Sequence, residues 1–183
     1  MGLYAGEFDG ELHQGCRQRL YHNVLRPRRG EGVMNYLKRM RTILMVDDDP
    51  DDYYLVKEAL IENGMHNDFR LVSDGMELMD YLFHRGKFAD SETPLPSLIL
   101  LDLNMPRKDG REALKELKTY PALRRIPVVV FTTSTDVEDI TACYEMGASS
   151  FISKPNTFDS LIETMKTLGK YWLNTAELPG QPN

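Results

Sequence analysis

From residue 42 onward, short apolar runs of strand length alternate with longer amphipathic stretches of helix length. The runs are TILMV (42–46), FRLV (69–72), SLILL (97–101), IPVVVF (126–131) and SFIS (150–153). The three central runs are almost continuously apolar, which is typical of strands covered on both faces. Strand–helix alternation repeated five times predicts an α/β domain, in which right-handed connections place helices on both faces of a parallel sheet.

Proline and glycine mark the ends of the stretches between these runs. We expect helices at 50–63, 75–84, 111–119, 136–146 and 158–172. Pro50 stands at a helix start and Gly64 follows a helix end, which is the usual asymmetry of these residues. Asp49 is expected to cap the first helix. Asp51 and Asp52 are expected in its first turn, facing water, where negative charge meets the positive end of the helix dipole.

The composition permits one domain of ordinary size with a real core. The chain has 183 residues, of which 42% are hydrophobic. The sequence holds no run of about eighteen apolar residues and no signal-peptide core, so we expect a cytoplasmic protein without a membrane anchor. Cys16 and Cys143 fit neither a zinc pattern nor a disulfide framework. Cys143 is expected to be a buried helix residue.

Charge divides the chain into a basic segment and an acidic body. Residues 1–42 hold eight Lys/Arg against four Asp/Glu, a net +4, whereas residues 43–183 hold fourteen against twenty-four, a net −10. An acidic body argues against nonspecific nucleic-acid binding. We interpret residues 1–41 as a disordered extension or sequence upstream of the native start, with a nucleic-acid-binding arm as the alternative. The domain is expected at 42–173, followed by a tail at 174–183 with no room for a DNA-binding domain.

Polar residues stand where the apolar runs end. These are Asp47 and Asp48 after the first run, Asp102 after the third, Thr132 after the fourth and Lys154 after the fifth. Taken singly, each has an ordinary reading as a turn residue, a helix cap, a strand residue or a surface charge. In a parallel sheet, however, the carboxyl ends of all strands lie on one edge, and ligands bind there. We therefore expect these side chains to converge.

The converging set has a chemical logic. Three close carboxylates raise one another's pKa unless a cation neutralises them, and oxygen-only ligands favour a hard cation such as Mg²⁺. A carboxylate beside that metal can attack phosphorus and form an acyl phosphate. The lysine supplies an opposing point charge, and the threonine hydroxyl can report the presence of the phosphoryl group.

Four segments resemble the signature segments of the response-regulator receiver domain. They are ILMVDDDPDD, LILLDLNMPRKDG, IPVVVFTTST and SSFISKP, in the family's order and spacing. The resemblance covers about residues 42–172. It implies a flavodoxin-like (βα)5 fold with strand order 2-1-3-4-5, and phosphorelay signal transduction through a 4-aspartylphosphate that a sensor histidine kinase provides, with Mg²⁺ required.

The resemblance also assigns roles around the metal and the phosphoryl group. Asp102 matches the phosphoacceptor. Asp48 matches the acid that ligates the metal directly, and Asp47 its neighbour that holds the metal through water. Asn104 matches the position whose backbone carbonyl completes the metal site.

Further roles concern the response to phosphorylation. Thr132 matches the switch hydroxyl, Phe151 the switch aromatic, and Lys154 the lysine that binds the phosphoryl group. In this family a cis peptide bond precedes the residue that matches Pro155, although cis is the minority form for any X–Pro bond.

A narrower resemblance is visible in FHRGKFADSETPLPSLILLDLNMP, KDGREALKELK and YWLNTAELP. These segments are similar to the single-domain regulators that partner phytochrome-type histidine kinases. The input signal would then be red or far-red light.

Two other functions share parts of this pattern. Haloacid-dehalogenase-type phosphatases also use a strand-end Asp with Mg²⁺, but they need a second Asp where this chain has Asn104, and an amide cannot transfer protons. A degenerate receiver that only binds partners would not need the full set of site residues. We therefore expect a phosphoacceptor with at most self-phosphorylation and autodephosphorylation, not an enzyme with a separate substrate.

Output is expected to pass through a surface of the domain to a downstream protein. The last helix has an apolar stripe at Phe158, Leu161, Ile162, Met165, Leu168 and Trp172, most of it expected in the core. Tyr171 and Leu173 lie off that stripe. The sequence therefore predicts homodimerisation through the face of the fourth helix, fifth strand and fifth helix.

Overall fold

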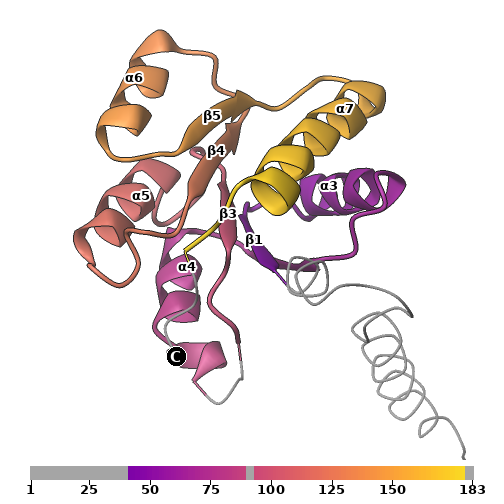
Figure 1. The fold of residues 1–183 in the computed structure, drawn as a ribbon. Helices are drawn as coiled ribbons and strands as arrows, with labels where there is room; N and C mark the ends of the chain where they lie inside the picture. Colours follow the sequence, from indigo (N-terminus) through magenta and orange to yellow (C-terminus); the bar gives the residue numbers. More distant parts are fainter. Residues whose placement is uncertain (1–40, 90–92, 180–183) are drawn as a thin grey trace, which may run out of the picture. The chain divides into compact units, whose positions relative to one another are not determined.

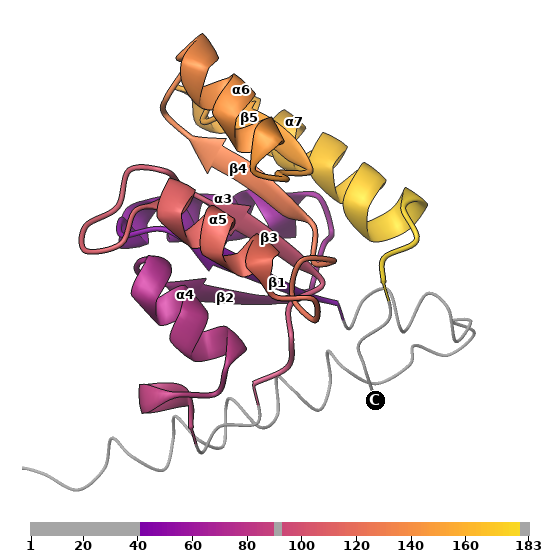
Figure 2. The same cartoon turned by 90° about the vertical axis from the view of Figure 1, so that its left-hand side faces the viewer.

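A five-stranded parallel sheet forms the centre of the computed structural model, which describes residues 41–89 and 93–179 (Figure 1). The strands are β1 (Thr42–Val46), β2 (Asp68–Val72), β3 (Leu98–Leu101), β4 (Val128–Thr132) and β5 (Ser150–Ser153). Their order is β2-β1-β3-β4-β5, which Figure 2 shows from bottom to top. The predicted fold class and strand order are confirmed.

Each of the five α-helices from α3 to α7 is preceded by a residue whose side chain accepts a backbone N–H from the first turn. The helices are α3 (Pro50–Glu62), α4 (Gly75–Leu82), α5 (Gly110–Thr119), α6 (Val137–Glu145) and α7 (Phe158–Gly169). Their caps are Asp49, Asp74, Asp109, Asp136 and Thr157. Caps of this kind satisfy N–H groups that have no partner within the helix. A short 3-10 helix, η1 (Gly86–Phe88), follows α4.

Two hydrophobic cores lie on opposite faces of the sheet. Successive residues of β1 alternate between them: Leu44 and Val46 join the core under α4, α5 and α6, whereas Ile43 and Met45 join the core under α3 and α7. Figure 1 shows the two helix layers on either side of the strands. Cys143 is buried in the first core, as predicted. Because both faces are covered, β1, β3 and β4 are buried throughout.

The end of the last helix differs from the prediction. After Gly169 the chain widens into a π-helical turn, η2 (Lys170–Thr175), in which the N–H of Ala176 donates to the carbonyl of Tyr171 at 2.7 Å. The wider turn rotates Leu173 into the core, where it is 2% exposed, while Tyr171 remains 55% exposed. The expectation that Leu173 adds to the surface is therefore wrong.

Arg41, just ahead of β1, ties the two ends of the domain together. Its Nη1 donates to the carbonyls of Trp172, Leu173 and Ala176 at 3.0, 3.0 and 3.3 Å. The ordered domain thus takes in Arg41 at one end, and helical structure continues to Thr175 at the other. The expectations for residues 1–40 lie outside the described residues. Within 41–89 and 93–179, no helix is long and apolar enough to cross a membrane.

Candidate functional site

The strand register places two predicted site acids side by side. Val46 of β1 pairs with Leu101 of β3, so the residues that follow them, Asp47 and Asp102, leave the sheet at the same level. Carboxylate oxygens of Asp47, Asp48 and Asp102 lie within 4.8 Å of one another. Asp47 and Asp102 are buried, whereas Asp48 is exposed. Three oxygen donors at this spacing fit a hard divalent cation that keeps water on its open side.

Lys154 follows β5, the last strand of the sheet, and its side chain reaches the same acids. Thr132 of β4 pairs with Ser153 of β5, and the N–H of Lys154 donates to the carbonyl of Thr132 at 2.7 Å. Its Nζ then donates to Oδ2 of Asp47 at 2.8 Å and of Asp102 at 3.1 Å. A third carboxylate, that of Asp52, accepts from Nζ at 2.6 Å. The three N–H groups of the ammonium thus face three carboxylates.

Burial and charge act against each other in this cluster. Burial raises the pKa of Asp47 to about 6, even though hydrogen bonds from Lys154 and from the N–H of Asp49 favour the ionised form. For Lys154, burial alone would lower the pKa, but hydrogen bonds to Asp47 and Asp52 outweigh it and raise the pKa above its usual value. Three carboxylates therefore contact one ammonium, and Asp48 adds a fourth carboxylate to the acid cluster, so the excess negative charge favours a bound cation.

Asp102 is held by the backbone of the loop after β3. Its Oδ1 accepts the N–H of Leu103 at 2.7 Å and of Asn104 at 3.3 Å, which leaves Oδ2 toward Lys154. The loop is closed by a hydrogen bond from the N–H of Gly110 to the carbonyl of Leu103 at 2.9 Å. A Cβ at Gly110 would collide with the backbone oxygen of Asp102. Close approach of the helix start to this loop therefore requires glycine.

Thr132 connects the site to the loop after β4. Its side chain is fully buried, and its Oγ1 accepts the N–H of Ser134 at 3.4 Å. The Ser134 hydroxyl donates to Asp139 on α6 at 2.7 Å, and Arg111 on α5 donates to both carboxylate oxygens of Asp139 at 2.9 and 2.6 Å. Phe151 on β5 is half-buried against the core on this side. A change at Thr132 can therefore reach α5 and α6 through hydrogen bonds.

Two details of the site differ from the expectations. Asp52 was expected to face water, but its carboxylate binds Lys154. The sequence position of Asp52 could have indicated this contact. A helix that starts shortly after Asp47 and Asp48 keeps its first turn near the sheet edge where the site lies. The implied cis bond before Pro155 is the other difference: the described residues contain no cis peptide bond. The trans form agrees with the general preference of X–Pro bonds.

Comparisons with known proteins agree with this geometry. A family model described as the response regulator receiver domain matches residues 43–166. The chain belongs to the response-regulator receiver family. This receiver is 40% identical over 139 residues to response regulator Rcp1 of Synechocystis, an alignment that covers 76% of the chain and 93% of Rcp1. Members of the family carry signals by phosphorylation in two-component systems.

Solved structures of relatives include a phosphorylated form and a metal-bound form. The phosphorylated cyanobacterial phytochrome response regulator RcpA is 41% identical, with a TM-score of 0.72, and the match covers 77% of this chain and 99% of RcpA. The Mn²⁺-bound form of Rcp1 is 38% identical, with a TM-score of 0.70, over 76% of this chain and 99% of that one. A relative in the receiver family thus binds a divalent metal ion. In this chain Asp47, Asp48 and Asp102 are placed so that they could hold one.

Proposed function

We propose that this receiver accepts a phosphoryl group on Asp102 from a sensor histidine kinase, with Mg²⁺ held by Asp47, Asp48, Asp102 and the backbone carbonyl of Asn104. The observation that supports this most directly is the placement of Asp102. One of its oxygens lies 3.1 Å from the Lys154 ammonium. Carboxylate oxygens of Asp102 and of two further acids lie within 4.8 Å of one another. A cytoplasmic location belongs to the proposal, since a histidine kinase draws its phosphoryl group from ATP.

In the transfer step, a carboxylate oxygen of Asp102 attacks phosphorus. The P–O bond of an acyl phosphate forms while the P–N bond to the kinase histidine breaks, and the ring nitrogen keeps the electron pair. When bound, Mg²⁺ neutralises charge on the phosphoryl oxygens. Lys154 donates to one of these oxygens, and the hydroxyl of Thr132 turns to donate to another. When the Thr132 hydroxyl turns, the N–H of Ser134 loses its hydrogen-bond acceptor. The loop after β4 therefore rearranges.

Phosphate uptake from a small donor tests the proposal. With acetyl phosphate and Mg²⁺, we expect the wild-type protein to take up about one acid-labile phosphate per chain, and Asp102→Asn to take up none. Asp159→Asn, which changes an exposed acid on α7, serves as the control and should behave as wild type. Uptake by Asp102→Asn equal to wild type would show that the acceptor is elsewhere. Continuous turnover of a phosphomonoester would instead support the phosphatase alternative.

We also propose that the kinase is of the phytochrome type, because RcpA, which this chain matches over 99% of its length, is a cyanobacterial phytochrome response regulator. Apolar side chains beside the site offer a docking surface: Tyr54 and Leu55 on α3 and Phe158 at the start of α7 are exposed. The two helices lie side by side in Figure 1. Phosphotransfer from a phytochrome-type kinase should be faster than from an unrelated histidine kinase, and equal rates would contradict this assignment.

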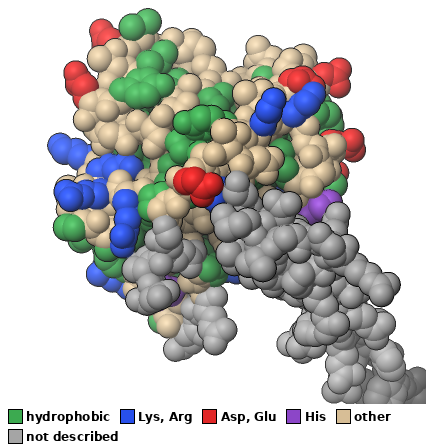
Figure 3. Space-filling view, in the orientation of Figure 1, with side chains coloured by type: hydrophobic (Ala, Val, Ile, Leu, Met, Phe, Trp, Pro, Cys, Tyr) green, Lys and Arg blue, Asp and Glu red, His purple; other side chains and the backbone are tan. Residues whose placement is uncertain are grey.

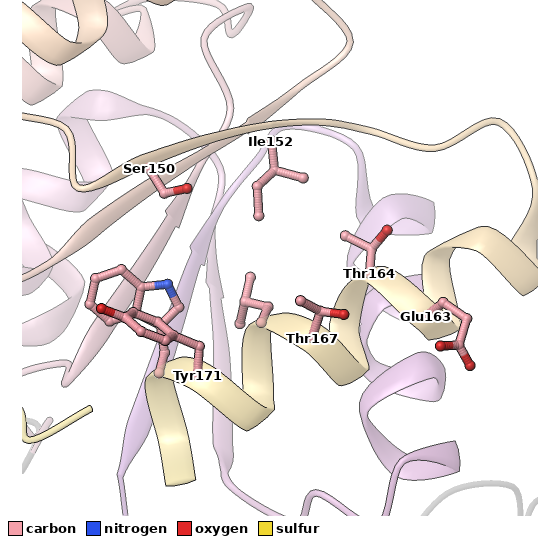
Figure 4. A pocket seen from close by; sticks show the side chains of 8 residues that line it. Ser150, Ile152, Glu163, Thr164, Thr167 and Tyr171 are labelled. Carbon is pink, nitrogen blue, oxygen red and sulfur yellow. The ribbon is translucent and has the colours of Figure 1, made fainter. Parts of the chain in front are cut away.

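The output surface that we propose is the face of α6, β5 and α7, which also supports homodimerisation. Hydrophobic side chains gather over α6 and near β5 in Figure 3, and Val137, Tyr144 and Tyr171 are among the large exposed ones of this part of the chain. A hollow of about 500 Å³ lies between β5 and α7, lined by Ile152, Tyr171 and Trp172 among others (Figure 4). Because β5 ends the sheet, its outer edge is open to a partner.

A further inference from the structure

The ammonium of Lys154 is shared between acids inside and outside the metal pocket. Two of its partners, Asp47 and Asp102, belong to the cluster of oxygens that can hold a cation. The third, Asp52, lies outside that cluster and yet makes the shortest of the three contacts, at 2.6 Å. The Asp52 carboxylate therefore binds the lysine without being placed to bind the metal.

Lys154 and a divalent cation would compete for the same two carboxylates. The ammonium donates to Oδ2 of Asp47 and to Oδ2 of Asp102, and both carboxylates are needed by a metal in the pocket. Like charges a few ångströms apart in a buried site repel strongly. When the metal binds, the lysine has to loosen from these two acids but stay near Asp102 to meet the phosphoryl group. An acid that does not bind the metal can hold the ammonium near Asp102 while the metal occupies the other two carboxylates.

The backbone holds Asp52 in the position that this task needs. Asp52 lies in the first turn of α3, where Pro50 fixes the first helical residue and the Asp49 side chain accepts the N–H of Asp51 at 2.9 Å. Lys154 follows β5, whose register with β4 sets its Cα. Its side chain is 10% exposed, so the surrounding protein limits where the ammonium can go. Both ends of the Asp52–Lys154 pair are thus anchored by regular structure.

We propose that Asp52 is a positioning residue that holds the Lys154 ammonium while Asp47 and Asp102 turn to the metal and then to the phosphoryl group. One N–H of the ammonium stays on Asp52, and the other two are released to the oxygens on Asp102. The inference rests on the proposed metal site. Its consequence is that Asp52 strengthens metal binding through the lysine, although it does not touch the metal.

Titration with Mn²⁺ alone, followed by the electron paramagnetic resonance signal of the free ion, tests this inference. We expect Asp52→Asn to raise the Mn²⁺ Kd roughly five- to tenfold, because the freed ammonium then competes fully for Asp47 and Asp102. Asp51→Asn is the matched control, since it removes the same charge from the same helical turn but leaves Lys154 untouched, and it should change Kd by less than about twofold. Asp52→Glu should recover most of the affinity.

A double-mutant cycle separates positioning from the simple attraction between Asp52 and the cation. In a Lys154→Gln background, Asp52→Asn should change the Mn²⁺ Kd by no more than about twofold, because there is no ammonium left to hold. An equal effect in both backgrounds would overturn the inference, as would an unchanged Kd in Asp52→Asn itself. If the wild-type protein bound no Mn²⁺, the proposed metal site would fall, and the inference with it. Circular dichroism checks that each variant is folded.

Discussion

At Gly110, one missing side chain determines whether the site loop can close. The position faces the backbone of Asp102 and Leu103, so the methyl group of alanine would displace the main chain that carries the phosphoacceptor. We expect Gly110→Ala to lower the free energy of unfolding by about 1–3 kcal/mol, as overpacking does elsewhere, and also to weaken Mn²⁺ binding. Urea denaturation and a metal titration measure the two effects.

Gly64→Ala is a suitable comparison for Gly110→Ala. Gly64 has a positive φ of 69° and open space around it, so alanine there strains the backbone without touching the site. Some stability should be lost, by about 1 kcal/mol, but the Mn²⁺ affinity should stay unchanged. If both variants bound the metal as well as wild type, the fit around Gly110 would be unimportant for the site.

The site acids at strand ends could be predicted because parallel strands all end on one sheet edge, whatever their separation in sequence. That rule predicts from the sequence alone that Asp47, Asp102 and Lys154 lie close together. Asp52 was missed because a helix terminus already accounted for its charge. The lysine that it binds lies 102 residues away, and the strand registers from β1 through β3 and β4 to β5 bring the two together.

At the scale of elements, Arg41 joins the start of β1 to η2, the π-helical turn that follows α7. Its guanidinium meets three carbonyls at the negative end of a helix, where a cation is favoured. We expect Arg41→Ala to lower the free energy of unfolding by about 1–3 kcal/mol, as the loss of hydrogen bonds to a charged group does. Denaturant unfolding measures this change. Arg124→Ala, at an exposed position, should lower the free energy of unfolding by less than about 0.5 kcal/mol. Equal losses of stability in the two variants would show that the Arg41 hydrogen bonds do not stabilise the domain.

The same contact explains why the last helix was only partly predictable. The sequence pattern located all five strands and the helices to within a few residues, because burial on both faces gives a continuous apolar run and burial of one helix stripe gives a clear period. A π-helical turn leaves no such period. Here Arg41, more than 130 residues away in sequence, binds the carbonyls that the widened turn exposes. The change in helical phase that buries Leu173 therefore depends on a tertiary contact.

At the scale of the whole molecule, the site edge and the proposed output face are joined by short routes. Lys154 directly follows β5, and Thr132, Ser134 and Asp139 lead from the end of β4 to α6. Arg111 extends this route to α5. A rearrangement at Thr132 thus needs to cross only one loop to alter α6, and the rest of the sheet can stay fixed.

Homodimerisation through the face of α6, β5 and α7 is the prediction that belongs to this scale. Tyr144 and Tyr171 are exposed there by 51% and 55%, whereas Leu173 is unsuitable for a test because its truncation would leave a cavity in the core. We expect light scattering to report a dimer for wild-type protein with Mg²⁺ and acetyl phosphate, and a monomer for Tyr144→Ala combined with Tyr171→Ala. Tyr54→Ala, at a position on α3 that is 61% exposed, is the control and should remain dimeric. If the double variant stays dimeric, or if the control variant dissociates into monomers, the dimer contact lies on another face.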